Sequence, residues 1–281
     1  MNVSVSEVPS SIVTEAEQAA DAADARAGID TRPARIDELD GVLARFEATW
    51  GVGRGADRAT VQALEHAGNT LLVAVPRAEE RPTKDAPRTP PPAIPLGATL
   101  GFLGWSGGIH VHSHMNAVDP TARGRGIGVA LKLRQRVVCL AHGVTEMRWT
   151  YDPLIRRNAR MNLVRLGAEV VAFLPDFYGE LRDAITGADR SDRFEVRWRL
   201  DSPRTTRALA RGPVPDWRAE GGLPLVADYE GVRAEDPDTA MRLRDASREA
   251  FAVLARDASL RVELDADGDY VFTHDDPDRE A

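Results

Sequence analysis

The sequence has a single cysteine, Cys139, among 281 residues. One cysteine excludes an internal disulfide and a zinc site built from several cysteines, and it fits a reducing compartment. Its apolar neighbours in a predicted helix indicate packing rather than chemistry. Long apolar runs are also absent, since no stretch approaches the roughly 20 apolar residues that span a bilayer. The N-terminal stretch lacks the basic start and apolar core of a secretory signal. We therefore expect a cytoplasmic protein without a membrane segment.

Positive charge is in short supply. Asp and Glu number 44 against 36 for Lys and Arg, which gives a formal net charge of −8. Only Lys84 and Lys132 are lysines, so almost all of the basic side chains are arginines. Non-specific nucleic-acid binding relies on a net positive surface that releases counterions. The charge balance therefore argues against nucleic acid as a partner, and any anionic ligand needs a local site.

What the sequence does contain is typical of a soluble globular protein, with 43% hydrophobic and 28% charged residues. Its length suggests two domains. Residues 1–33 have few large apolar groups and are predicted to form a flexible N-terminal arm or a weakly docked helix. Strand and helix patterns alternate over 34–203, which predicts an α/β or α+β domain with a mixed sheet covered by helices. Residues 204–281 are predicted to form a small α+β C-terminal extension with an acidic tail.

The most informative stretch is NAVDPTARGRGIGVALKLRQR, residues 116–136. A predicted strand ends at Val118, Pro120 breaks its ladder, and a glycine-rich loop opens into an amphipathic helix. Glycines allow close approach to the backbone, and the free amides and dipole of a helix N-terminus attract an anion. Arg123 and Arg125 add planar donors that suit phosphate. We therefore predict a pyrophosphate site at residues 123–128.

Two familiar phosphate loops do not match this stretch. A Walker loop ends in Gly-Lys-Ser or Gly-Lys-Thr, and this loop has neither ending. A Rossmann fingerprint requires Gly-x-Gly-x-x-Gly after the first strand of a βαβ unit, whereas the glycines here are Gly124, Gly126 and Gly128 and the loop follows a predicted hairpin. The pattern that remains is Arg-x-x-Gly-x-Gly, beginning at Arg123.

This pattern, with Val118-Asp119-Pro120 before it and Ala130-Leu131 after it, resembles the acyl-CoA binding motif of the GNAT N-acyltransferase superfamily. A following strand and a short Asn-bearing helix that ends at Leu166-Gly167 add to the resemblance, which covers about residues 34–200. It implies a GNAT-like fold, with a mixed, mostly antiparallel sheet flanked by helices. It also implies acetyl-CoA or another acyl-CoA, such as succinyl-CoA, as co-substrate, and no metal.

Four further stretches resemble signatures of a subgroup of predicted bacterial acyltransferases. Some members of that subgroup are associated with amino-acid N-succinylation alongside N-succinylamino acid racemases. The stretches are His112-Ser113-His114-Met115, Arg148-Trp149-Thr150-Tyr151-Asp152-Pro153-Leu154, Phe177-Tyr178-Gly179-Glu180 and Ser191-Asp192-Arg193-Phe194.

The resemblance also implies how an acyl-CoA is held. Backbone amides of the glycine loop hold the pyrophosphate, and the pantetheine lies between the strand ending at Val118 and the strand starting near Glu146. Asn158 is expected to hydrogen-bond the pantetheine, with a helix-cap role as the alternative. The implied cofactor-binding residues are Ala117, Val118, Arg123, Gly124, Arg125, Gly126, Ile127, Gly128 and Asn158.

Direct acyl transfer needs a base to make the amine neutral and a proton for the leaving thiolate. His110, His112 and His114 alternate along one predicted strand, so they share a face if the strand is unbulged. The pKa of histidine suits proton abstraction at neutral pH. By its distance from the phosphate loop, His112 takes the position of the catalytic glutamate in the histone acetyltransferase branch. We predict His112 as the base and His114 as the second candidate; a hydrogen-bonded scaffold and a metal site are the alternatives.

The usual proton donor of the family is missing. Many GNAT enzymes carry a tyrosine four residues before the terminal glycine of the short helix, and Leu163 stands there in this sequence. Protonation of the thiolate is then left to Tyr178, to Tyr151 or to water, and we predict Tyr178. The alternative for Tyr178 is a structural role, as an aromatic side chain of the core.

Other candidate residues concern the acceptor. Asp152 ends a predicted strand at the same sheet edge as the loop, where it binds an amine or caps the next turn. Arg156, Arg157 and Arg193 are candidates for binding a carboxylate, and we choose Arg193, together with Tyr151, as substrate-binding residues.

The sequence thus predicts an acyl-CoA-dependent N-acyltransferase that transfers an acetyl or succinyl group to a small-molecule amine, such as an amino acid. The alternatives are acetylation of a protein or antibiotic amine, and a GNAT-fold module that binds CoA or a small ligand without catalysis. The C-terminal extension is expected to cover the acceptor cleft or to make a homodimer contact.

Overall fold

The computed structural model describes residues 8–77, 94–181, 187 and 189–278. The chain forms two compact units, and the division between them falls between Met147 and Arg148. Strand β5 (Glu146–Tyr151) begins in the first unit and continues into the second.

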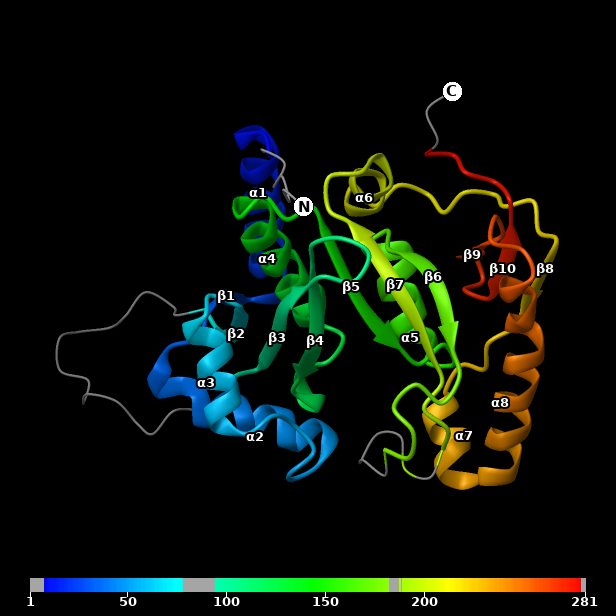
Figure 1. The fold of residues 1–281 in the computed structure, drawn as a ribbon, viewed down its shortest axis with the longest axis horizontal. Coiled ribbons are helices and arrows are strands. Elements are labelled where there is room, and N and C mark those ends of the chain that lie inside the picture. The colour runs from blue at the N-terminus through cyan, green and yellow to red at the C-terminus, as the bar shows by residue number, and fades with distance from the viewer. Residues whose placement is uncertain (1–7, 78–93, 182–186, 188, 279–281) are drawn as a thin grey trace. The chain divides into compact units, whose positions relative to one another are not determined.

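In its described residues, the first unit holds the strands β1 to β4 and the helices α1 to α4 (Figure 1). Local signals set several of its boundaries: Asp57 caps a helix by accepting hydrogen bonds from the amides of Ala59 and Thr60. The elements are α1 (Ser10–Ala27), β1 (Ile29–Pro33), η1 (Ile36–Glu38), α2 (Leu39–Trp50), α3 (Arg58–His66), β2 (Thr70–Pro76), β3 (Gly97–Gly104), β4 (His110–Val118), η2 (Pro120–Ala122) and α4 (Ile127–Ala141).

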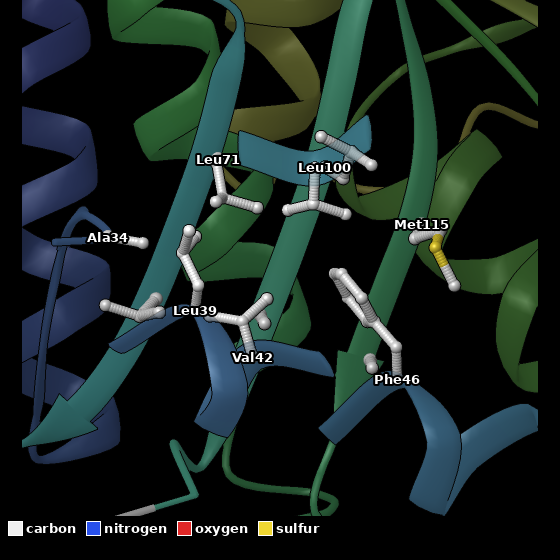
Figure 2. Close-up of a cluster of buried hydrophobic side chains, with 11 residues drawn as sticks. Ala34, Leu39, Val42, Phe46, Leu71, Leu100 and Met115 are labelled. Atoms are coloured by element: carbon white, nitrogen blue, oxygen red, sulfur yellow. The ribbon is translucent and has the colours of Figure 1, made fainter. Parts of the chain in front are cut away.

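The strands of this unit run in the order β1-β2-β3-β4, and each neighbouring pair is antiparallel. Helices α2 and α3 pack on one face, and α4 packs on the other. Figure 2 shows the cluster under α2, where Leu39, Val42 and Phe46 meet Leu100 and Met115 of the strands. Burial of each such side chain contributes about 1.5–3 kcal/mol, so this cluster is a main support of β4, the strand that carries the predicted histidines.

Helix α1 lies in the stretch for which the sequence predicts a flexible arm or a weakly docked helix. Apart from Asp24, its buried residues are alanines, Ala16, Ala20, Ala23 and Ala27, which recur at helical spacing. Because alanine is small, α1 packs closely on α4 without large apolar groups. Ion pairs reinforce this contact, and Arg134 of α4 bonds to Asp21 and Asp24 of α1. The low content of large apolar residues that suggested an arm is therefore what permits the close packing.

The second unit combines strands β5, β6 and β7 with the C-terminal part of the chain (Figure 1). Its first three strands have the order β5-β7-β6, and β8-β10-β9 form a separate antiparallel sheet. The elements are α5 (Arg156–Ala159), a π-helical turn η3 (Arg160–Arg165), β6 (Glu169–Leu174), β7 (Arg193–Arg199), α6 (Pro203–Leu209), β8 (Gly221–Leu223), α7 (Tyr229–Glu235), α8 (Pro237–Phe251), η4 (Ala252–Ala255), β9 (Arg261–Leu264) and β10 (Tyr270–Thr273).

The boundary that the sequence predicts near residue 203 lies inside the second unit, where a shared aromatic core joins the residues on its two sides. Phe194 of β7 lies 4.5 Å from Phe251 of α8 and 5.6 Å from Tyr270 of β10, measured between ring centroids. Phe173 of β6 lies 5.1 Å from Phe251. The C-terminal residues thus bury their aromatic side chains against β6 and β7, because fewer than about 80 residues bury too little apolar surface by themselves.

Helices flank mostly antiparallel strands, which confirms the predicted α/β (α+β) class. Among the residues described, no helix combines the length and the apolar character that a bilayer crossing requires.

Candidate functional site: a glycine loop and a histidine pair

The predicted phosphate loop leads directly into α4. Gly124 and Gly126 have φ of +82° and +92°, and Gly126 is the N-cap residue of α4. A Cβ atom at either glycine would meet nothing within 4 Å, so glycine is required there by backbone conformation and not by crowding. The first bond of the helix is donated by the amide of Ala130 to the carbonyl of Gly126. The amides of Ile127 and Gly128 therefore have no acceptor within the helix, and an anion can take that place.

Two side chains hold the ends of this loop. The amide Nδ2 of Asn116 on β4 donates to the carbonyl of Gly128 at 3.1 Å, and Asn116 Oδ1 is buried with no hydrogen-bond partner in the described part of the chain. Asp119 bonds to Arg45 of α2 and accepts from the amide and hydroxyl of Thr121. The bonds from Thr121, followed by Arg45, lower the pKa of Asp119. The loop is thus anchored before and after its glycines.

The two arginines of the loop have different surroundings. Arg123 is exposed, and its side chain makes no hydrogen bond or ion pair with the described residues. Arg125 donates from Nη2 to the carbonyl of Ala27 at 2.6 Å, at the C-terminus of α1. Arg123 is therefore available to an anion, whereas Arg125 also ties the loop to α1. The contact to α1 joins residues 98 positions apart, so no local sequence pattern predicts it.

The predicted histidine row contains a β-bulge. Leu100 of β3 pairs with Met115, but the next residue, Gly101, pairs with Ser113, so His114 is an extra residue of β4. The rings of His112 and His114 nevertheless lie 6.0 Å apart, centroid to centroid. Both are near the ring of Phe102, at 5.4 and 5.8 Å.

His110 has a different environment from the other two histidines. It is buried at the start of β4, and its Nδ1 lies 2.9 Å from the carbonyl oxygen of Gly108 in the hairpin turn. The structure therefore brings His112 and His114 together and gives His110 a partner in the backbone.

The two paired histidines share an electrostatic environment that disfavours protonation. Burial lowers the pKa of His112 to about 4, and electrostatic repulsion from His114, Lys132 and His110, in their protonated forms, adds to the effect. Burial also lowers the pKa of His114. At neutral pH both rings are therefore neutral and have a nitrogen lone pair able to accept a proton.

In the second unit, Tyr178 and Arg193 lie next to each other. The Tyr178 hydroxyl is 3.1 Å from Oγ1 of Thr150 on β5, and the guanidinium carbon of Arg193 is 5.4 Å from the centre of the tyrosine ring. Tyr178 is exposed. The predicted proton donor and the predicted carboxylate-binding residue thus form one cation–π pair at the surface of this unit.

Asp152 and Tyr151 have partners inside the second unit. Both carboxylate oxygens of Asp152 accept from Arg244 of α8 at 2.8 Å, and Oδ1 also accepts from the amide of Leu154 at 3.0 Å. The hydroxyl of Tyr151 is buried 3.1 Å from that of Tyr270, and burial raises the pKa of Tyr151. Sequence reasoning missed Arg244, because its partner is 92 residues away. The roles predicted for Asp152 and Tyr151 in catalysis and substrate binding stay predictions.

The short helix of the resemblance is α5 followed by the π-helical turn. Asn158 is half-buried on α5, and Leu163 is buried in the turn. Arg156 bonds to the carbonyl of Leu225, and Arg157 pairs with Glu230 of α7. These two arginines thus tie the helix to the C-terminal part of the unit. Among the described residues, no three or more His, Cys, Asp or Glu side chains are grouped so that they could hold a metal ion.

No protein-family model matches the chain, and no curated protein matches it either. Solved structures do match. An N-acetyltransferase from Staphylococcus aureus is 16% identical with a TM-score of 0.45, and the match covers 62% of this chain and 99% of that one. Ard1 from Thermoplasma volcanium is 15% identical with a TM-score of 0.42, covering 60% and 96%. Arabidopsis thaliana Naa50, in complex with a bisubstrate analogue, is 14% identical with a TM-score of 0.43, covering 60% and 97%.

Proposed function

We propose that this protein is an acyl-CoA-dependent N-acyltransferase that acts on a small-molecule amine. The observation that carries the proposal is the glycine loop: Gly124 and Gly126 have positive φ just before α4, and the space beside each glycine's Cα is open. An anion held there accepts hydrogen bonds from amides that have no helical acceptor, and Arg123 adds a charge. The pyrophosphate of CoA is the anion that this loop is proposed to bind.

His112 is proposed as the base. The acyl-CoA supplies a thioester; the transfer forms a carbon–nitrogen bond and breaks the carbon–sulfur bond. His112 takes a proton from the acceptor nitrogen, which frees the lone pair for attack. Its lowered pKa keeps the ring unprotonated at neutral pH, with His114 beside it as the second candidate. The base lies on β4 and the phosphate loop leads into α4, and only the short turn η2 separates the two elements along the chain.

Tyr178 is proposed to return a proton to the departing sulfur. Its exposed hydroxyl and its contact with Thr150 support this role. Arg193, next to the same ring, is proposed to bind a carboxylate of the acceptor or of a succinyl group. An amino acid as acceptor, succinyl or acetyl as acyl group, and a cytoplasmic location belong to the same proposal.

A second candidate function is a module that binds CoA without transferring an acyl group. Leu163 favours it, because a buried aliphatic side chain replaces the tyrosine that many family members use as proton donor. The two candidates share the loop and differ in chemistry. Acetylation of a protein or antibiotic amine is the remaining alternative for the acceptor.

One experiment distinguishes the two candidates. The protein is incubated with acetyl-CoA or succinyl-CoA and a panel of L- and D-amino acids, and release of free thiol is followed. We expect thiol release with one acyl-CoA and a subset of acceptors, and a higher Tm with CoA because ligand binding stabilises the folded state. A CoA-induced rise in Tm with no thiol release across the panel would favour the binding module. No rise in Tm with CoA would contradict both.

A further inference from the structure

A chain of buried hydrogen bonds crosses the first unit from α4 to β3. Lys132 Nζ donates to Ser113 Oγ at 2.6 Å, and Ser113 Oγ donates to Gln135 Oε1 at 2.7 Å. Gln135 Nε2 donates to Thr70 Oγ1 at 2.7 Å, and Thr70 Oγ1 donates to the carbonyl of Gly101 at 3.2 Å. We call these five residues the buried polar chain. Each hydroxyl accepts one bond and donates the next, an order in which successive bonds strengthen one another.

This chain lies where apolar packing would be expected. Ser113, Lys132 and Gln135 are all buried between the sheet and α4. Burial lowers the pKa of Lys132 well below its usual value, so the site disfavours the charged lysine. Polar groups at such a site are costly unless they are bonded, and they therefore tolerate few alternative arrangements.

Gly101 leaves room for the chain. A Cβ atom at this position would lie 2.5 Å from Gln135 Nε2 and 2.8 Å from Thr70 Oγ1, both too close. Only glycine lets the Gln135–Thr70 bond pass directly over β3. Gly101 is also the residue of β3 that pairs with Ser113, so the chain passes over the strand pair at the bulge.

The bulge follows from what the two neighbours of His114 contact. Ser113 bonds to side chains of α4, whereas Met115 packs in the cluster under α2, on the opposite face of the sheet. In a regular strand, residues two apart share a face. One extra residue, His114, reconciles the two contacts. The carbonyl of Met115 is also held, by Thr99 Oγ1 at 2.7 Å.

We propose that the buried polar chain is a positioning device, which holds the bulge at His114 and so keeps the rings of His112 and His114 on the face of the sheet that carries Phe102. Ser113 and Lys132 act through the strand and touch no substrate, so they are positioning residues. Loss of the Ser113 hydroxyl releases the anchor on the α4 side. Strand β4 can then slip toward a regular register, in which Met115 keeps its place under α2 and both histidines turn to the opposite face of the sheet, away from Phe102. The effect on turnover rests on the proposed function; the effect on the rings does not.

The kinetic test compares Ser113→Ala with Ser247→Ala, a change of another buried serine whose hydroxyl bonds to the carbonyl of Arg244. We expect Ser113→Ala to lower kcat roughly 10- to 100-fold, because small displacements of reacting groups cost factors of this size. The KM for acyl-CoA should stay within about twofold, since the phosphate loop is untouched. Ser113→Thr keeps a hydroxyl and should restore most of the kcat. Ser247→Ala should match the wild type.

The second readout needs no activity. Long-range proton–nitrogen NMR spectra report the ring nitrogens of His112 and His114 in the free protein. We expect both sets of signals to move in Ser113→Ala and to return in Ser113→Thr. If the wild type shows no turnover, the proposed function fails, and these spectra alone decide on the positioning device.

If Ser113→Ala does not fold, Thr70→Val takes its place, because it removes only the far end of the chain and leaves Ser113 in β4. The same two readouts apply. A folded variant with a lower Tm but with wild-type kcat and unchanged histidine signals would overturn the proposal, because the chain would then stabilise the fold without positioning the rings.

Discussion

Asn116 on β4 donates its side-chain amide to the carbonyl of Gly128 in the first turn of α4, at 3.1 Å. The bond spans the loop that contains Gly124 and Gly126, and it ties the strand before the loop to the helix after it. The φ values of the two glycines are therefore held between fixed ends. A loop held in this way loses little conformational freedom when it binds an anion.

The first prediction concerns this bond. Asn116→Ala should weaken CoA binding about five- to tenfold, because one neutral hydrogen bond contributes roughly 1 kcal/mol. Isothermal titration calorimetry with CoA measures the change. The matched control is Asn69→Ala, since the amide of Asn69 also bonds to a backbone carbonyl, that of Leu64, away from the loop. Equal Kd values for Asn116→Ala and the wild type would show that the loop needs no such tie.

The second prediction concerns Gly126. Gly126→Glu should abolish CoA binding, because it places a negative charge where the pyrophosphate is proposed to lie. The variant should still fold, since a Cβ here meets nothing within 4 Å and a non-glycine residue at positive φ costs only about 1–3 kcal/mol. Thermal unfolding and CoA titration measure the two effects. Gly126→Ala separates them, because it carries the strain without the charge and should bind CoA within a few-fold of the wild type. An unchanged Kd in Gly126→Glu would refute the site.

Local sequence was a good guide to the loop and a poor guide to what surrounds it. The strand, glycines and helix of residues 116–136 lie in sequence order, and the structure has β4, the loop and α4 in that order. The bulge at His114 depends on contacts on opposite faces of the sheet: the Ser113 side chain bonds to α4, and the Met115 side chain packs under α2. No alternation of residue types along the strand predicts this. The partner of Asp152, Arg244, could not be predicted, because any of the many arginines is an equal candidate.

The packing of α1 on α4 was hard to predict from the sequence for a different reason. The alanines of α1 give it little amphipathic contrast, so the usual sign of a buried helix face is weak. The spacing of Ala16, Ala20, Ala23 and Ala27 is nevertheless helical, and it was the one signal that could have predicted the contact with α4.

The third prediction uses the pKa of His112. Neutral histidine is the active form of a base, and burial lowers this pKa from 6.5 to about 4. The acid limb of the kcat/KM profile, which reports the free enzyme, should therefore fall near pH 4 and not near pH 6.5. The same group should make the stability of the fold depend on pH, because His112 binds a proton more readily in the unfolded chain than in the folded one. Its contribution to stability is fully present above about pH 6.5 and is lost as the pH falls from there toward 4. Values of kcat/KM, and unfolding measured from below pH 4 to pH 8, test the two expectations.

Replacement of the ring is the complement to this test. His112→Ala should lower kcat at pH 7 roughly 100-fold or more while the KM for acyl-CoA changes little, because a general base acts in the transition state. His142→Ala, the same change at an exposed position just after α4, serves as control. If His112→Ala retains turnover and His114→Ala loses it, the neighbouring ring is the base.

The fourth prediction decides between two roles of Asp152. Its carboxylate pairs with the fully buried Arg244, which also pairs with Asp189 at 2.7 Å. Removal of one partner from a buried ion pair costs about 3–5 kcal/mol, so Arg244→Ala should lower Tm by roughly 10 °C. Arg242→Ala, an exposed arginine on the same helix, should leave Tm nearly unchanged. Asp152→Asn is the deciding variant. A lower Tm with an unchanged KM for the amine means that Asp152 serves the fold, whereas an unchanged Tm with a raised KM means that it binds the acceptor.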